Sequence, residues 1–187
     1  RTRMQLHVDE AGTVGPYRER SHEVIKVKDL PLAVEDLREL EMHNKNFQNV
    51  KKIELSASST GQVQWKIDSK LKGDERLIER VAGRTFRISG GGFWQVHKKA
   101  AEVLSSAVTE MGAAAGIDKE ADNLDLYGGV GLFSGALAAK FGNDLRITSV
   151  ESFRQATDDA TLNLADLAKA KAVCAPVERF LNERVGN

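Results

Sequence analysis

A glycine-rich bend between two apolar runs is the feature of this sequence that most limits its fold. Residues 125–142 read DLYGGVGLFSGALAAKFG, so that three glycines fall within four positions between a strand-like run and an alanine-rich helical run. Glycine tolerates positive φ and leaves the main chain open to close approach. The first N–H groups of a helix that begins near Leu132 would point into the same crevice. The pattern predicts a ligand site at a strand-to-helix turn.

The bend belongs to a repeating pattern of strand and helix. Residues 123–127 and 146–151 are short apolar runs, residues 132–142 and 153–170 have helical spacing, and residues 172–177 are a third strand candidate. Alternation of this kind predicts a parallel sheet with right-handed crossovers, its strands in the order third, second, first. Such sheets bind ligands at the carboxyl ends of their strands, which is where the glycines stand.

The first ninety residues have the texture of an antiparallel domain. A helix is predicted from Leu32 to His43, after Pro31. Alternation and turn signals predict strands over residues 1–8, 17–20 and 22–27, and two more within 50–68. We therefore expect a mixed α+β central domain over residues 1–90. Residues 91–187 would then hold a linking helix and the first half of a Rossmann-like domain.

Composition limits the classes of function. The chain has 27 Lys and Arg against 27 Asp and Glu, so no overall charge favours a nucleic acid or a membrane. No apolar run approaches the ~20 residues that span a bilayer, so no membrane partner is expected. Cys174, the single cysteine, is read as a small core residue and fits a cytoplasmic protein. The four histidines lack ligand spacing, so no metal is predicted. Because Arg1 opens within a strand pattern, we expect a piece of a longer protein.

An acid completes the candidate site. Glu151 ends the second strand, about twenty residues after the last glycine of the bend, where an acid commonly accepts hydrogen bonds from ribose hydroxyls. Bend, helix start and acid together predict an adenosine-type ligand. A dinucleotide motif would need glycine where Ser134 stands, and Gly135 comes one step late. The run DLYGGVG instead resembles the first motif of S-adenosylmethionine-dependent methyltransferases. A turn that merely packs helix on sheet is the structural alternative.

Three blocks, in order, resemble the RNA uracil-5-methyltransferases, which make 5-methyluridine in transfer or ribosomal RNA. They are GGFWQVHKKAAEVLSSAV, LDLYGGVGLFSGALA and VESFRQATDDATLNL, and residues 1–27 resemble that family's central domain. The resemblance implies an α/β fold, with a mixed α+β central domain before a truncated Rossmann-like class I methyltransferase domain that has a partial parallel sheet. It also implies S-adenosylmethionine as cofactor and RNA as partner.

The resemblance assigns roles to particular residues. Gln95 matches a glutamine that contacts the methionine part of the cofactor, and Glu151 matches the ribose-binding acid. Phe93 is similar to an aromatic residue that stacks near the target uracil. The first-motif positions that would contact the cofactor are Tyr127, Gly129, Gly131 and Leu132. The chain departs from the family pattern at Gly128, where many members have cysteine, and at Leu132, which replaces a frequent asparagine.

The resemblance places the reacting groups outside this chain. The family adds a cysteine thiolate to carbon 6 of uracil and later removes the carbon-5 proton with a carboxylate base. Both groups follow a D-P-P-R block that this sequence lacks. We therefore expect no catalytic residue here, and a fragment that is inactive by itself.

Two other functions remain open at this point. One is a different S-adenosylmethionine-dependent methyltransferase acting on a small molecule or a protein. The other is a noncatalytic module that binds nucleic acid or a protein partner and keeps a vestigial turn. A half sheet would leave the strand over residues 123–127 unpaired along one edge, so we expect either pairing of two copies there as a homodimer or a poorly soluble piece.

Overall fold

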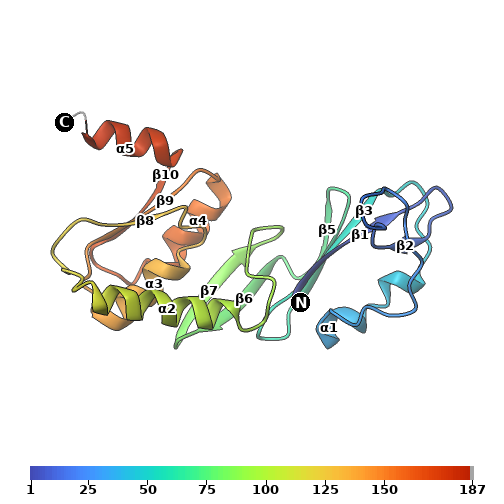
Figure 1. Ribbon diagram of the computed structural model, residues 1–187, viewed down its shortest axis with the longest axis horizontal. Helices are drawn as coiled ribbons and strands as arrows, with labels where there is room; N and C mark the ends of the chain where they lie inside the picture. The colour runs from blue at the N-terminus through green and yellow to red at the C-terminus, as the bar shows by residue number, and fades with distance from the viewer. Residues whose placement is uncertain (186–187) are drawn as a thin grey trace. The chain divides into compact units, whose positions relative to one another are not determined.

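The computed structural model describes residues 1–185, which form two compact units (Figure 1). The first unit consists of Arg1–Leu77 with Gln95–Lys98, and the second consists of Ile78–Trp94 with the chain from Lys99 onward. The chain therefore leaves the first unit and returns to it once. The predicted domain boundary at residue 90 stays a prediction.

The first unit is built on a five-stranded antiparallel sheet. Its strands, in the order β2-β1-β3-β4-β5, are β1 (Arg3–Val8), β2 (Val14–Gly15), β3 (Lys52–Ala57), β4 (Val63–Ile67) and β5 (Lys70–Gly73). Leu6 lies opposite Ile53 on the buried face, and Leu37 packs against the same core. The strands predicted over residues 1–8 and within 50–68 are confirmed, because their alternate apolar residues pack against one core.

Three predicted elements of the first unit are wrong. Residues 17–20 and 22–27 form no strands, and their β pairing is limited to an isolated bridge between Tyr17 and Val24. The helix predicted over 32–43 is reduced to α1 (Glu35–Arg38) and a 3-10 turn, η1 (Met42–Asn44). Glu41 has a φ of 49°, which interrupts the helix between them. A segment this short gains little from helix propensity alone, so local turns prevail.

A histidine–tyrosine stack forms beside β1 of this sheet. The rings of His7 and Tyr17 are stacked with centroids 3.5 Å apart, and His22 meets Tyr17 edge-on at 5.3 Å. Partial burial lowers the pKa of His7 below its usual 6.5, and the nearby charges of His22 and Lys52 lower it further. The folded state therefore favours the neutral imidazole.

Acid is expected to destabilise the first unit through His7. Because the folded-state pKa lies below the unfolded value of 6.5, the contribution is fully present above that pH and is lost as the pH falls below it. Urea unfolding of wild type at pH 8 and pH 5.5 should show the loss, and His7→Gln should reduce it. His97→Gln, at an exposed histidine outside the stack, is the control. An unchanged pH dependence in His7→Gln would contradict this account.

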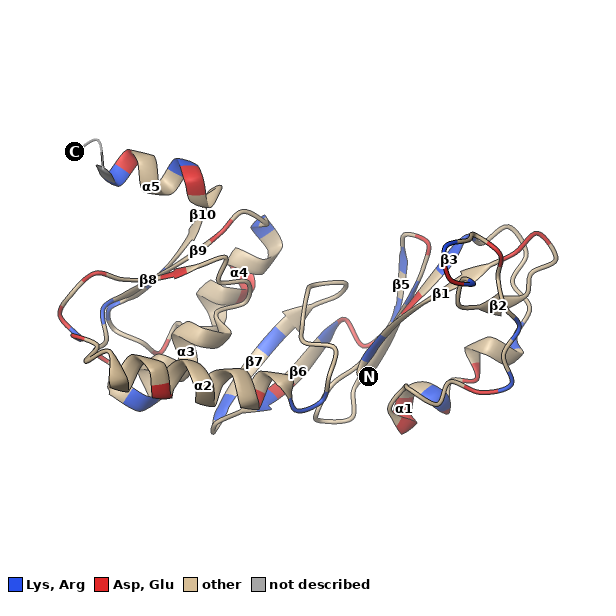
Figure 2. Ribbon diagram, in the orientation of Figure 1, with Lys and Arg blue, Asp and Glu red and all other residues tan. Residues whose placement is uncertain are grey.

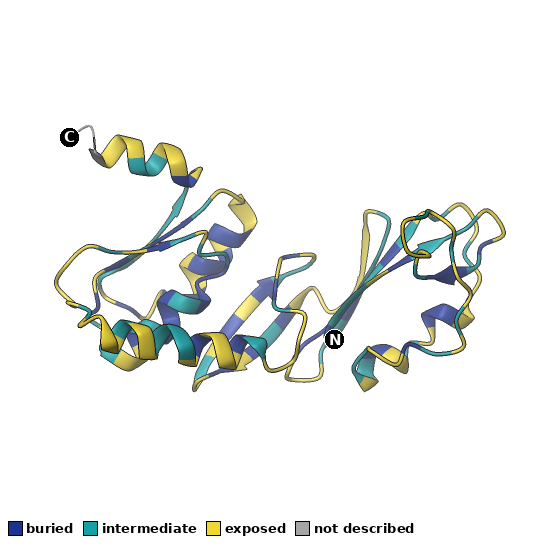
Figure 3. Cartoon of the chain, viewed as in Figure 1, coloured by how far each residue is buried: buried dark blue, intermediate teal, exposed yellow. Residues whose placement is uncertain are grey.

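The second unit contains a parallel sheet with helices around it. Its strands are β8 (Asn123–Leu126), β9 (Ile147–Glu151) and β10 (Ala170–Cys174), in the order β10-β9-β8, and its helices are α2 (Ala100–Ala114), α3 (Leu132–Phe141), α4 (Arg154–Asn163) and α5 (Val177–Val185). The predicted strand order is confirmed. The helix predicted over residues 153–170 ends earlier, at Asn163. Figure 3 shows buried positions along α3 and β9. Val150 of β9 is fully buried.

A β-hairpin packs beside these helices. It consists of β6 (Arg76–Val81), within which the boundary between the units falls, and β7 (Arg84–Ser89). Phe86 of β7 is buried against α3, and a Cβ atom added at Gly135 would lie 3.0 Å from its ring. Gly135 therefore serves close packing between helix and hairpin, which explains a glycine one step late for a dinucleotide motif.

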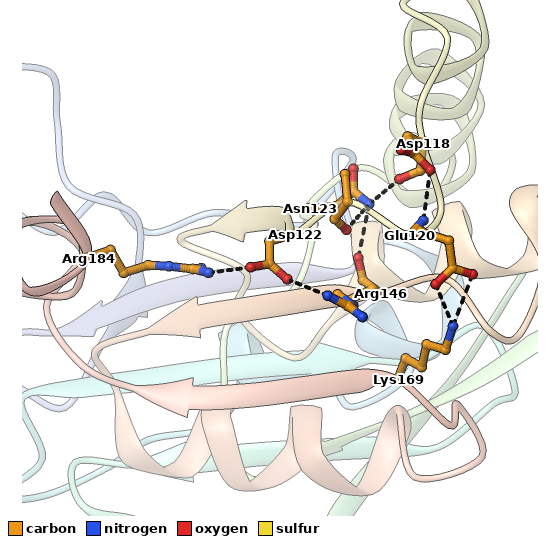
Figure 4. A network of polar contacts seen from close by, with 8 residues as sticks. Asp118, Glu120, Asp122, Asn123, Arg146, Lys169 and Arg184 are labelled. Atoms are coloured by element: carbon orange, nitrogen blue, oxygen red, sulfur yellow. Dashed lines mark hydrogen bonds and ion pairs between the residues drawn. The ribbon is translucent and has the colours of Figure 1, made fainter. Parts of the chain in front are cut away.

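Exposed ion pairs join the loops at the amino ends of the parallel strands (Figure 4). Asp122 binds Arg184 of α5 at 2.8 Å and Arg146 at 3.5 Å, and Glu120 binds Lys169 at 2.8 Å. Exposed pairs of this kind contribute about 0–1 kcal/mol each. They lie at the opposite end of the sheet from the glycine bend, so they hold α5 and the loops without entering the site.

Lys and Arg are interspersed with Asp and Glu along the chain in each unit (Figure 2). Within residues 1–185, no helix has the length and apolar character needed to cross a membrane.

Candidate functional site

The glycine bend joins β8 to α3 and has the backbone that the sequence predicts. Gly129 and Gly131 have φ angles of 55° and 86°. A Cβ atom at Gly129 would meet nothing within 4 Å, whereas one at Gly131 would lie 3.1 Å from Leu164. Gly131 is therefore required for packing as well as for φ, while Gly129 leaves an open main-chain surface. Helix α3 begins at Leu132, as predicted.

Glu151 faces the bend from the end of the neighbouring strand. Its Oε2 atom accepts a hydrogen bond from the Gly129 N–H at 3.2 Å, and its Oε1 atom accepts one from the Phe153 N–H at 2.8 Å. The structure therefore brings the predicted acid and the predicted glycine into direct contact. The carboxylate is half-buried, so part of it stays accessible to a ligand.

A buried aspartate that sequence reasoning left without a role fixes the start of α3. Asp125 is 8% exposed, and its Oδ2 atom accepts hydrogen bonds from the Ser134 N–H at 3.0 Å and the Ser134 hydroxyl at 2.7 Å. Burial raises the pKa of Asp125, and the two bonds from Ser134 oppose that rise. An acid inside an otherwise apolar strand is the sequence signal that could have identified it.

Tyr127 and Leu132 occupy different environments. Tyr127 has a φ of 59°, a strained value for a residue with a side chain, and its ring is exposed. Its hydroxyl donates a hydrogen bond to Glu178 at 2.9 Å in the first turn of α5, and this contact raises the pKa of Tyr127. Leu132 is buried. Its position therefore offers a main-chain N–H at the helix start, with the side chain in the core.

The two remaining predicted residues belong to different units. Phe93 lies in the second unit and is 70% exposed. Gln95 lies in the first unit, where its carbonyl accepts a hydrogen bond from the Thr2 hydroxyl at 3.0 Å. The structure groups Tyr127, Glu151 and the glycines of the bend, and contact of Gln95 with a cofactor stays a prediction.

Cys174 differs from its expected burial. The residue is half-buried at the carboxyl end of β10, opposite Glu151 in the strand register. Its Sγ atom lies 3.6 Å from the Ser152 carbonyl oxygen. The prediction of a core cysteine is wrong because the strand ends here, and the buried position falls to Ala175.

Two more residues of the site were missed. Phe153 is 57% exposed, directly beyond Glu151, and presents an aromatic face. Ser149 is buried, and its Oγ atom lies 2.0 Å from the place where a Cβ atom of Gly128 would stand. This contact leaves no room for a side chain at residue 128, so glycine fits there. No group of three metal-ligating side chains is present among residues 1–185.

Comparison with known proteins identifies relatives along almost the whole chain. No family model matches it. An uncharacterized RNA methyltransferase of Streptomyces avermitilis is 31% identical over 211 residues, which cover 97% of this chain and 48% of that protein. A tRNA (uracil-5-)-methyltransferase homolog A of Mus musculus is 37% identical over 93 residues, covering 50% of this chain and 14% of that protein. The resemblance to RNA uracil-5-methyltransferases is confirmed. The chain spans about half the length of the bacterial relative.

A solved structure has the same fold. The tRNA (uracil-54, C5)-methyltransferase of Pyrococcus abyssi, in complex with S-adenosyl-L-homocysteine, matches with a TM-score of 0.67 at 19% identity. The match covers 94% of this chain and 55% of that chain. The predicted fold class, a mixed α+β part followed by a Rossmann-like methyltransferase domain with a partial parallel sheet, is therefore confirmed.

Removal of the Asp125 carboxylate is expected to destabilise the second unit. Asp125→Ala leaves the buried N–H and hydroxyl of Ser134 without their acceptor, at a cost of about 3 kcal/mol. Asp125→Asn keeps an acceptor and removes the buried charge, at a cost of about 1 kcal/mol. Urea unfolding measures both, with Asp122→Ala in the exposed network as the control. Equal stability of Asp125→Ala and Asp122→Ala would contradict the assigned role.

Proposed function

We propose that this chain is the S-adenosylmethionine-binding part of an RNA uracil-5-methyltransferase that converts a uridine of tRNA or rRNA to 5-methyluridine. The observation that carries the proposal is the contact of Glu151 with the Gly129 N–H at the carboxyl ends of β8 and β9. Ligands of open α/β sheets bind at this edge.

The residues of the bend fit the adenosyl part of this cofactor. Gly129 leaves the main chain open, and the Glu151 carboxylate can accept hydrogen bonds from the two ribose hydroxyls. The exposed face of Phe153 can stack on a purine ring. S-adenosylmethionine has no pyrophosphate, so its binding does not require the third glycine of a dinucleotide motif. When bound, the cofactor supplies an activated methyl group.

The part of this chain in the reaction is binding and orientation. Glu151 and the bend hold the adenosyl group, and Tyr127, fixed by Glu178, borders the same edge. The exposed ring of Phe93 offers a stacking face to a base that has left its RNA helix. We assign neither the nucleophile nor the base to this chain, because the family's motif for them has no counterpart in the sequence. Cys174 contacts the Ser152 carbonyl and is not proposed as the nucleophile.

Two further properties accompany this proposal. A single cysteine fits a protein that works in the reducing cytoplasm, where tRNA and rRNA are modified. β8 pairs only with β9 among the described strands, so its outer edge could accept a strand from a second copy. Sedimentation equilibrium tests this homodimer, and a monomer at high concentration would exclude it.

Cofactor binding is the direct test of the proposed function. Titration calorimetry with S-adenosylhomocysteine should show saturable binding to the wild-type chain, whereas NAD should not bind. Glu151→Gln should weaken the affinity for S-adenosylhomocysteine by about tenfold or more, because hydrogen bonds to a charged carboxylate contribute about 1.5–3 kcal/mol each. Glu120→Gln, at an exposed glutamate at the other end of the sheet, is the matched control and should bind like wild type. Absence of binding to wild type, or equal affinity in Glu151→Gln, would overturn the proposal.

A further inference from the structure

Helix α4 is attached to strand β7 through polar side chains along one face. Asp159 and Asn163 lie on successive turns of the helix, and Asp166 follows just beyond its end. Asp166 pairs with the Arg84 side chain at 2.6 Å. Asp159 accepts hydrogen bonds from the Ser89 N–H at 2.8 Å and from its hydroxyl at 2.7 Å. These residues hold the two ends of β7, at Arg84 and at Ser89.

Asn163, between them, differs because it also reaches the glycine bend. The residue is 4% exposed. Its Oδ1 atom accepts a hydrogen bond from the Arg87 N–H at 2.8 Å, and its Nδ2 atom donates to the Arg87 carbonyl at 3.0 Å. The same Nδ2 atom donates to the Val130 carbonyl, also at 3.0 Å. One side-chain amide therefore bonds the main chain of β7 and the main chain of the bend.

This arrangement leaves little freedom to the two segments that Asn163 joins. The side-chain amide of Asn163 has two N–H groups and one acceptor oxygen. Each of these three groups takes part in a hydrogen bond. A buried carbonyl or N–H that loses its partner is costly, so Val130 and Arg87 cannot shift apart without breaking a bond. Leu164, the residue directly after the helix, packs against Gly131.

The segment after β7 connects the fixed main chain of Arg87 to Phe93. Ser89, held by Asp159, accepts a hydrogen bond from the Gly92 N–H at 2.9 Å, which closes a tight turn. Trp94 is buried, with its ring 5.8 Å from that of Phe86. Phe93, between the turn and Trp94, is exposed.

We propose that Asn163 is a positioning residue that couples the glycine bend to β7, so that a ligand in the bend also orders the turn over residues 89–92 that presents Phe93. The inference rests on the proposed function. There, the ligand of the bend is the adenosyl group, and Phe93 is the residue that stacks on the target base. Nothing in the coupling requires Asn163 to touch either ligand.

Hydrogen–deuterium exchange with S-adenosylhomocysteine tests the coupling. In wild type, the ligand should slow exchange at residues 128–132 and also at residues 87–92, which lie outside the bend. In Asn163→Leu, which has a similar volume and no polar atoms, the affinity should fall by about tenfold, or about 1.4 kcal/mol. The ligand should then protect residues 128–132 without protecting residues 87–92. Asn163→Ala, which removes the same three hydrogen bonds without placing a large apolar side chain against the main chain, carries the same test if the leucine variant does not fold.

A matched control separates coupling from general loosening of the hairpin. Asp166→Ala breaks the Arg84 pair on the same face and leaves the bend untouched, so the ligand should still protect both segments. Ligand protection of residues 87–92 that persists in both Asn163 variants would overturn the inference while leaving the proposed function intact.

Failure of wild type to bind would instead refute the proposed function. The inference can still be tested without ligand, because both Asn163 variants should speed exchange at Gly131 and Asp166→Ala should not. Equal exchange at Gly131 in all four proteins would refute the inference in that case.

Discussion

The hydrogen bond between the Gly129 N–H and the Glu151 carboxylate joins the ends of two neighbouring parallel strands. It depends on a backbone that only glycine adopts easily at residues 129 and 131, and on a helix that starts where the bend ends. Asp125 stabilises the start of that helix by accepting two hydrogen bonds from Ser134. The proposed adenosyl site is therefore a property of main-chain geometry, in which few side chains take a direct part.

The two ends of the parallel sheet are held together by different kinds of contact. At the amino ends, exposed ion pairs such as Asp122 with Arg184 add little stability individually. At the carboxyl ends, the polar contacts include buried ones in which each group has a defined partner, as with Asn163 and the Val130 carbonyl. The buried contacts therefore fix the positions of main-chain groups at the carboxyl ends, where the proposed adenosyl site lies.

Much of the fold could be predicted from the sequence because its periodicities are strong and local. The strand over residues 123–126, the bend and the helix from Leu132 follow one another without ambiguity, and Glu151 ends the next strand. The strands predicted over residues 17–20 and 22–27 are absent. Charged residues that alternate there in sequence pair across a turn instead, as Arg18 does with Glu23. The interrupted helix before His43 depends on the backbone of Glu41, which no propensity indicates.

Contacts between distant segments could not be predicted from local pattern. Asn163 reads as an ordinary helix residue, and its bonds to Arg87 and Val130 exist only once β7 lies against α4. Likewise, the close approach of the Ser149 side chain to Gly128 exists only in the folded structure.

The amide resonance of Gly129 gives the most direct test of the central claim. In a ¹⁵N-labelled chain titrated with S-adenosylhomocysteine, this resonance should move and saturate, because the ligand enters beside the Gly129 N–H and competes for Glu151. Gly116, an exposed glycine with nothing near its Cβ position, serves as an internal reference and should not move. Saturable shifts elsewhere in the chain, with Gly129 unchanged, would contradict the account.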